Sequence, residues 1–218
     1  MLTIYGVYRS RAIRPLWVLA EAGTPFTHVP VMQAYRLPDP HAAGAPLNTA
    51  MADFLSVNPL GQVPAMRDGA LVLSESLAIC LHIARKFGGN LGPATDDEAS
   101  VMEQWALFAA TAVEPHAIEI LYAIRDGLAD TPTGDGLMRV AAEKLRRPLN
   151  RLETHLQGRD WLMDRFSVAD IMVEECLRYG QPYGPLLADF PAVARWLAAC
   201  QARPAFQQVW AKRLAEPE

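Results

Sequence analysis

The stretch that decides the fold is Gly61-Gln62-Val63-Pro64-Ala65-Met66, followed by Leu71-Val72-Leu73-Ser74-Glu75-Ser76-Leu77-Ala78-Ile79. It begins with a glycine turn and continues as two apolar runs, with the turn-forming pair Asp68-Gly69 between them. The second run ends in Ser74-Glu75-Ser76, which supplies side-chain oxygens where a helix leaves its first N–H groups unpaired. The pattern therefore predicts a β-hairpin followed by a helix.

A proline at the start of a strand is unusual, because it removes one donor from the hydrogen-bond ladder. We expect the Val63-Pro64 bond to be cis, which leaves the backbone N–H and C=O of Val63 free to pair with an extended peptide. Glu75-Ser76 follows twelve residues later, and the helix that starts there adds a site for negative charge. The sequence therefore predicts an edge that binds a short anionic peptide.

Length and charge narrow the class of protein. A chain of 218 residues is long enough for two domains. A net charge of −4 does not indicate nucleic-acid binding. Residues 1–90 hold seven Lys and Arg against five Asp and Glu, whereas residues 91–218 hold thirteen against nineteen. This small imbalance suits an anionic ligand bound mainly by the first part.

The cysteines and the apolar runs indicate a cytoplasmic protein. Cys80, Cys176 and Cys200 are an odd number, lie far apart and stand in helical apolar contexts, so we expect buried thiols in a reducing compartment. There is no uninterrupted 18-residue apolar run and no signal peptide, so we expect no membrane partner. The five histidines have no ligand spacing, so we infer no metal.

The sequence pattern changes at residues 88–93, whose composition is typical of a linker. Before it, strand and helix patterns alternate as βαβ and then ββα. After it we find only helix patterns, with expected bends at Pro115 and Pro148. The fold class is therefore an α/β domain over residues 1–87 and an all-α bundle over residues 94–218.

With the Val63-Pro64 and Glu75-Ser76 pairs in place, the chain resembles the glutathione transferase superfamily. The resemblance covers nearly the whole chain and implies that the first domain is thioredoxin-like. It also implies glutathione binding by five residues: Gln62, Val63, Pro64, Glu75 and Ser76. Glu75 is expected to accept from the γ-glutamyl ammonium, while Ser76 and the helix-start N–H groups bind its carboxylate.

Ser10 stands where the first strand passes into the first helix, near free N–H groups and the positive end of the helix dipole. Ser10-Arg11-Ala12-Ile13-Arg14 resembles serine-type members of the superfamily, in a bacterial-like cytosolic branch. That likeness implies that the Ser10 hydroxyl donates to the glutathione sulfur and stabilises its thiolate. Two alternatives stay open: Ser10 only caps the helix, or Tyr5 or Tyr8 contacts the thiol.

The connection from Met32 to Thr49 is longer than such units need, and its prolines favour an ordered flap over the ligand. Four of its residues are candidates for the glycine carboxylate, although a solvated loop explains them equally well: Gln33, Tyr35, Arg36 and His41. The electrophile pocket is expected between the domains, lined by Trp105, Phe108 and Tyr8. No cysteine precedes Cys80, which argues against disulfide reductase chemistry.

Phe166-Ser167-Val168-Ala169-Asp170-Ile171 reads as a capping box with a hydrophobic staple, which is a structural feature. The resemblance implies a cytoplasmic, homodimeric glutathione transferase that uses glutathione as co-substrate against a small electrophile or a peroxide. Two alternatives are a non-catalytic glutathione- or ligand-binding protein and a glutathione-dependent isomerase or dehalogenase, because fold alone does not guarantee chemistry.

Overall fold

The computed structural model describes residues 1–217 and divides the chain into two compact units. The first unit contains Met1–Gly92 together with the residues from Pro204 onward, and the second is Pro93–Arg203. The break falls at the expected linker. The last helix, however, was expected in the helical domain and instead belongs to the first unit.

The sheet of the first unit has the strand order β2-β1-β3-β4. Its strands are β1 (Leu2–Tyr5), β2 (Thr27–Val29), β3 (Ala65–Asp68) and β4 (Leu71–Leu73). β1 pairs parallel with β2 and antiparallel with β3, and β3 pairs antiparallel with β4 through the predicted hairpin. The turn between β3 and β4 uses Gly69 at φ +61, a conformation that favours glycine.

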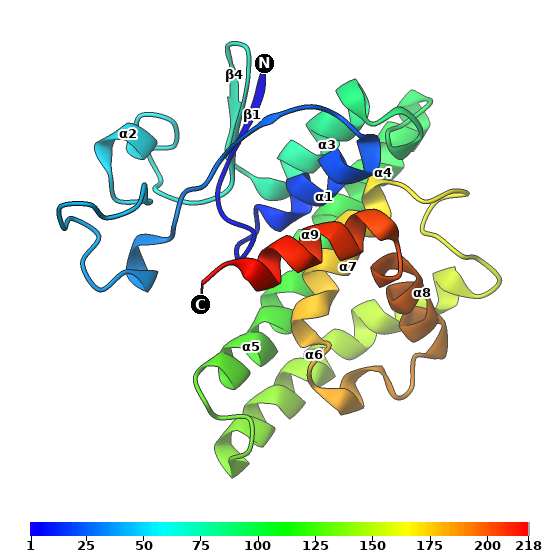
Figure 1. Ribbon diagram of the computed structural model, residues 1–218. Helices are drawn as coiled ribbons and strands as arrows, with labels where there is room; N and C mark the ends of the chain where they lie inside the picture. Colours follow the sequence, from blue (N-terminus) through cyan, green and yellow to red (C-terminus); the bar gives the residue numbers. More distant parts are fainter. Residues whose placement is uncertain (218) are drawn as a thin grey trace. The chain divides into compact units, whose positions relative to one another are not determined.

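Helices cover both faces of this sheet, as the thioredoxin-like prediction requires. α1 (Ile13–Ala22) and α3 (Ser76–Phe87) lie on one side, and the short α2 (Ala52–Leu55) lies on the other (Figure 1). On the α2 side, Phe54 packs with Val31 and Ala65 in a buried cluster. Two 3₁₀ turns complete this part of the chain, η1 (Ala34–Arg36) and η2 (Gly89–Leu91).

The last helix, α9 (Pro204–Ala215), packs along α1. Its Phe206 ring meets the Trp17 ring edge-on, with 4.9 Å between ring centroids, and both side chains are buried. This buried aromatic contact helps to hold α9 against α1.

The second unit is entirely helical. Its elements are α4 (Asp96–Phe108), η3 (Ala109–Val113), α5 (Glu114–Arg125), α6 (Pro132–Leu156), α7 (Val168–Leu177), η4 (Arg178–Gly180), η5 (Gly184–Leu187) and α8 (Pro191–Gln201). Every residue of α7 is buried, and α7 contacts α4, α5 and α8, so it forms the centre of the bundle. The predicted capping box is confirmed, because the Ser167 and Asp170 side chains each bond to backbone N–H groups at the start of α7.

At the expected bend near Pro115 the helix is interrupted. A π-helical segment, η3, separates α4 from α5 just before Pro115, which has no N–H to donate. By length and composition alone, Asp96–Arg125 could cross a membrane, with a mean hydropathy of 1.3 over 18 residues. In the structure it supplies buried side chains such as Met102 and Ile120 to the core of the second unit.

Candidate functional site

The predicted peptide-binding edge has the expected backbone form, because the Val63-Pro64 bond is cis. Asn58, which is 3% exposed, builds the turn that leads into it. The Asn58 amide donates to the Gln62 carbonyl at 2.7 Å, and its oxygen accepts from the Leu60 N–H at 3.2 Å. Sequence reasoning gave Asn58 no role, although an Asn-Pro pair is a recognised turn signal.

The start of α3 differs from the predicted side-chain cap. Glu75 is the N-cap residue, and its side chain forms no capping hydrogen bond within residues 1–217. Ser76 is buried, and its hydroxyl accepts from the Arg14 guanidinium at 3.0 Å, whereas Glu75 is exposed. The helix start therefore combines backbone N–H groups with a buried cation from α1, an arrangement that favours a carboxylate.

The Arg14 contact was not foreseen. Arg14 stands in the motif at the start of the first helix, but its sequence separation of 62 from Ser76 hides the contact from local sequence patterns. Arg14 is 1% exposed, so it is a core side chain as well as a charge.

Ser10 lies in the Ser10 loop (residues 6–12), between β1 and α1. Its hydroxyl donates to the Val7 carbonyl at 2.7 Å and accepts from the Ala12 N–H at 3.0 Å. The side chain is half-buried. In this arrangement the hydroxyl stabilises the turn, and it would have to redirect its proton from Val7 to donate to a bound sulfur.

Gly6 shows that the Ser10 loop and the peptide-binding edge lie together. A Cβ placed on Gly6 would meet the Val63 Cβ at 3.2 Å and the Ser10 Oγ at 3.6 Å. The φ of Gly6, +136, also favours glycine. The structure therefore places two of the predicted site residues, Ser10 and Val63, next to the same backbone position.

The two competing tyrosines lie in different places. The Tyr5 ring packs against Phe54, 6.3 Å between centroids, in the cluster on the α2 side of the sheet. Tyr8 is 7% exposed and meets the His28 ring edge-on, with 5.2 Å between ring centroids. Because Tyr8 is so deeply buried, it offers little surface to the predicted substrate pocket.

The connection over residues 32–49 is ordered by Asn48, which is fully buried. Its amide donates to the Pro40 and Pro46 carbonyls at 2.9 and 3.0 Å. Two of the four candidate residues for the glycine carboxylate are engaged elsewhere: Gln33 donates to the Arg9 carbonyl and Arg36 to the Pro217 carbonyl. The other two, Tyr35 and His41, are exposed.

Trp105 and Phe108 are both buried in the second unit, with their rings 5.4 Å apart and the Arg151 guanidinium over both. A pocket of about 590 Å³ lies between α4 and α6. Trp105 lines it together with Arg151 and His155, whereas Phe108 does not. The two predicted pocket residues thus touch each other, but only one faces this cavity.

Two further features bear on cofactors. Among residues 1–217 no group of three or more His, Cys, Asp or Glu side chains is arranged to hold a metal ion. All three cysteines lie in this part of the chain, are buried and form no disulfide.

Comparison with known proteins identifies the same family in both units of the chain. A family model described as the glutathione S-transferase N-terminal domain matches residues 9–86, and one for the C-terminal domain matches residues 130–204. The chain is 34% identical over 220 residues to glutathione S-transferase 3 of Zea mays, covering 95% of this chain and 92% of that protein.

Solved structures give the same result. Glutathione transferase F7 from Populus trichocarpa has a TM-score of 0.80 at 26% identity, covering 98% of this chain and 99% of that one. Glutathione S-transferase-I, solved with the ligand lactoylglutathione, has a TM-score of 0.78 at 28% identity, covering 97% and 99%. These likenesses confirm the predicted pairing of a thioredoxin-like domain with an all-helical one.

Proposed function

Because this chain belongs to the glutathione S-transferase family, we propose that it activates the glutathione thiol as a thiolate and directs it at a small hydrophobic electrophile or a peroxide. The protein is a glutathione transferase, and glutathione is its co-substrate. The observation that carries the proposed mechanism is the closeness of Val63 and Ser10 across Gly6. A tripeptide paired with Val63 brings its cysteine to the Ser10 loop.

Each residue then has a defined role. The Val63 backbone pairs with the peptide, and the exposed Glu75 carboxylate accepts from the γ-glutamyl ammonium. Ser76 and the first N–H groups of α3 hold the γ-glutamyl carboxylate, with the Arg14 charge behind them. Ser10 donates to the sulfur, which lowers the thiol pKa and keeps the nucleophile ionised near neutral pH.

The finer family assignment rests on Ser10. We assign the chain to the serine-type enzymes, because the Ser10 hydroxyl lies beside the peptide edge, whereas Tyr5 packs on the α2 side of the sheet. The relatives reported above include enzymes of Zea mays and Populus trichocarpa, so they lend no support to the bacterial-like branch.

Compartment and assembly are also part of the proposal. Three buried cysteines outside any disulfide and a reduced co-substrate fit the cytoplasm. Large apolar side chains are exposed on β4 (Leu71, 41%; Val72, 40%) and on α4 (Val101, 39%; Leu107, 66%). A homodimer would cover such positions, since an isologous interface buries the same patch twice.

The test pairs binding with turnover. Calorimetry first establishes that the protein binds glutathione, and the same preparation is then assayed with an activated aryl halide and with an organic hydroperoxide. Conjugation or peroxide reduction supports the proposal. Tight binding without turnover of either substrate would favour the non-catalytic binding protein, and turnover only of a halogenated or isomerisable substrate would favour the dehalogenase or isomerase.

A further inference from the structure

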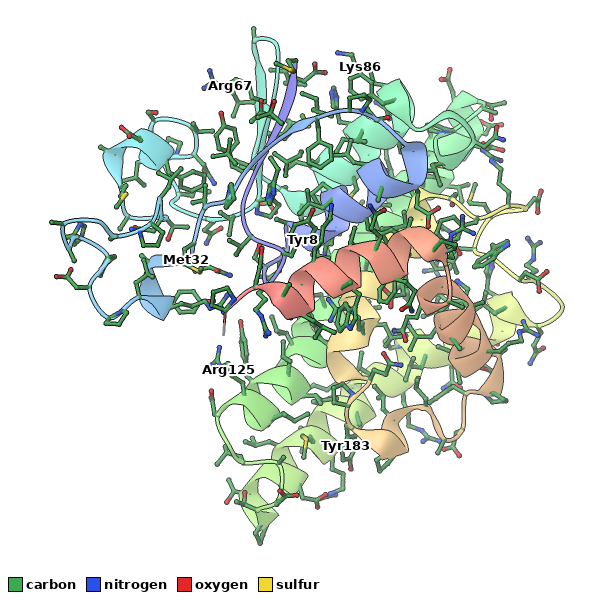
Figure 2. All side chains as sticks on the ribbon, in the orientation of Figure 1. Tyr8, Met32, Arg67, Lys86, Arg125 and Tyr183 are labelled. Atoms are coloured by element: carbon green, nitrogen blue, oxygen red, sulfur yellow. The ribbon has the colours of Figure 1, made fainter. Side chains whose placement is uncertain are left out.

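The Ser10 loop is fastened to the C-terminal segment of the chain. The Glu216 carboxylate accepts the Tyr8 N–H through one oxygen and the Arg9 N–H through the other, each at 2.7 Å. Hydrogen bonds of a carboxylate to backbone N–H groups are among the strong ones in proteins. Figure 2 shows Tyr8 beside α9, the helix that leads into Glu216.

Further hydrogen bonds hold Tyr8 and Arg9 in the same place. The Arg9 side chain donates to the Glu216 carbonyl at 2.9 Å, and the Arg213 guanidinium donates to the Tyr8 carbonyl at 2.9 Å. From the flap, Gln33 donates to the Arg9 carbonyl at 3.3 Å. The N–H and C=O groups of both residues before Ser10 are therefore held by parts of the chain distant in sequence.

The hydrogen bonds of the Ser10 hydroxyl do not fix the position of the Ser10 loop, so other contacts have to hold the loop in place. The bonds to Val7 and Ala12 run within the loop, so they shape the turn without fixing where it stands relative to Val63. Glu216 reaches the loop from the end of α9, which is itself packed on α1 through Phe206. It ties the loop to a rigid element, which is how precise sites are supported.

We propose that Glu216 is a positioning residue for Ser10: its carboxylate holds the Ser10 loop where the hydroxyl can reach a sulfur bound beside Val63. This inference rests on the proposed role of Ser10. The Glu216 carboxylate accepts hydrogen bonds from the Tyr8 and Arg9 backbone N–H groups and takes no part in the chemistry. This carboxylate lies against two N–H groups that are flanked by the Arg9 and Arg213 guanidiniums. Such a binding site is suited to a carboxylate.

The experiment uses the full chain with Glu216→Ala and the milder, isosteric Glu216→Gln. Glu143→Gln, at an exposed position on α6, removes the same charge and is the matched control. Hydrogen exchange of a peptide covering residues 7–12 should be about tenfold faster or more in Glu216→Ala, because two amides lose charged acceptors. The kcat should fall severalfold with a nearly unchanged KM for glutathione, and the thiol pKa of bound glutathione should rise.

Chemical rescue separates positioning from a general loss of structure. Formate should restore part of the kcat of Glu216→Ala by binding where the Glu216 carboxylate was removed, whereas chloride at the same ionic strength should not. The Glu143→Gln control should match the parent in exchange, kcat and thiol pKa. A Glu216→Ala variant with reduced kcat that formate does not restore, and with an unmoved thiol pKa, would reduce Glu216 to a stabilising contact and overturn the proposal.

The outcomes distinguish this proposal from the proposed function. Unchanged exchange over residues 7–12 in both Glu216 variants overturns the anchoring, whatever Ser10 does. An increase in kcat overturns it in favour of a lid that blocks the site. Faster exchange with an unmoved thiol pKa in both Glu216→Ala and Ser10→Ala removes the role of Ser10, and the positioning proposal with it.

Discussion

Replacing Ser10 with alanine removes a hydroxyl that now donates to the Val7 carbonyl at 2.7 Å. In the glutathione complex we expect this proton to turn to the sulfur, so one bond is exchanged for another. A hydrogen bond to a charged acceptor contributes about 1.5–3 kcal/mol, whereas the neutral bond given up contributes about 0.5–1.5 kcal/mol. The net stabilisation of the thiolate, about 1–1.5 kcal/mol, corresponds to about one pKa unit.

The assay is the thiolate absorbance of the enzyme–glutathione complex, titrated with pH. In Ser10→Ala the thiol pKa should rise by about one unit while glutathione affinity changes little, because the peptide is held elsewhere. Ser10→Thr keeps the hydroxyl and serves as the matched control, so its titration should stay close to the parent. The pH profile of kcat should move upward together with the thiol pKa.

A clear result would refute this reasoning. If Ser10→Ala leaves the thiol pKa in place while Tyr8→Phe raises it, the role belongs to the tyrosine. Tyr5→Phe is the corresponding negative control, because Tyr5 packs on Phe54. If none of the three variants moves the pKa, the thiolate is stabilised by backbone and helix dipole alone.

Three further predictions concern binding, assembly and pH. Glu75→Ala or Ser76→Ala should weaken glutathione binding by roughly 1–3 kcal/mol in calorimetry, and parent-like affinity in both would misplace the γ-glutamyl site. Light scattering should give twice the 24.0 kDa chain mass at micromolar concentration, and a monomer would contradict the dimer. Burial raises the pKa of Asp170 from 3.8 to about 6. The folded chain then binds this proton more tightly than the unfolded chain, so the contribution to stability falls, by roughly 3 kcal/mol, as pH rises through that window. Denaturant unfolding at pH 4 and pH 7 should show this loss in the parent and not in Asp170→Asn, and equal pH dependence in both would contradict it.

Structural features that depend on residues close together in the sequence could be predicted from the sequence. The hairpin, the cis bond at Val63-Pro64 and the capping box at Ser167 each depend on a few consecutive side chains, and all three are present. The break between α4 and α5 was foreseen only as a bend at Pro115. Its π-helical segment, η3, packs against α7, a contact between distant residues that local patterns do not encode.

The contacts that assemble the site were out of reach, because they join distant parts of the chain. Arg14 meets Ser76 across 62 residues, and Glu216 meets Tyr8 across 208. The roles proposed for the exposed Glu75 and the half-buried Ser10 rest on the resemblance, since nothing in their own neighbourhood separates a ligand-binding residue from a helix cap. Asn48 and Asn58 were missed because an asparagine in a loop reads as a solvated residue, whereas both are buried.

The packing of α9 on α1 means that the sheet-containing unit is discontinuous along the chain. A ribosome completes residues 1–92 early, but Phe206, which covers Trp17, is made only after the whole second unit. No single cut can therefore release the first unit intact, and a fragment ending at Gly92 would leave the Trp17 side of α1 bare. The order of synthesis makes the helical unit the first that can close its core, and the sheet-containing unit the last.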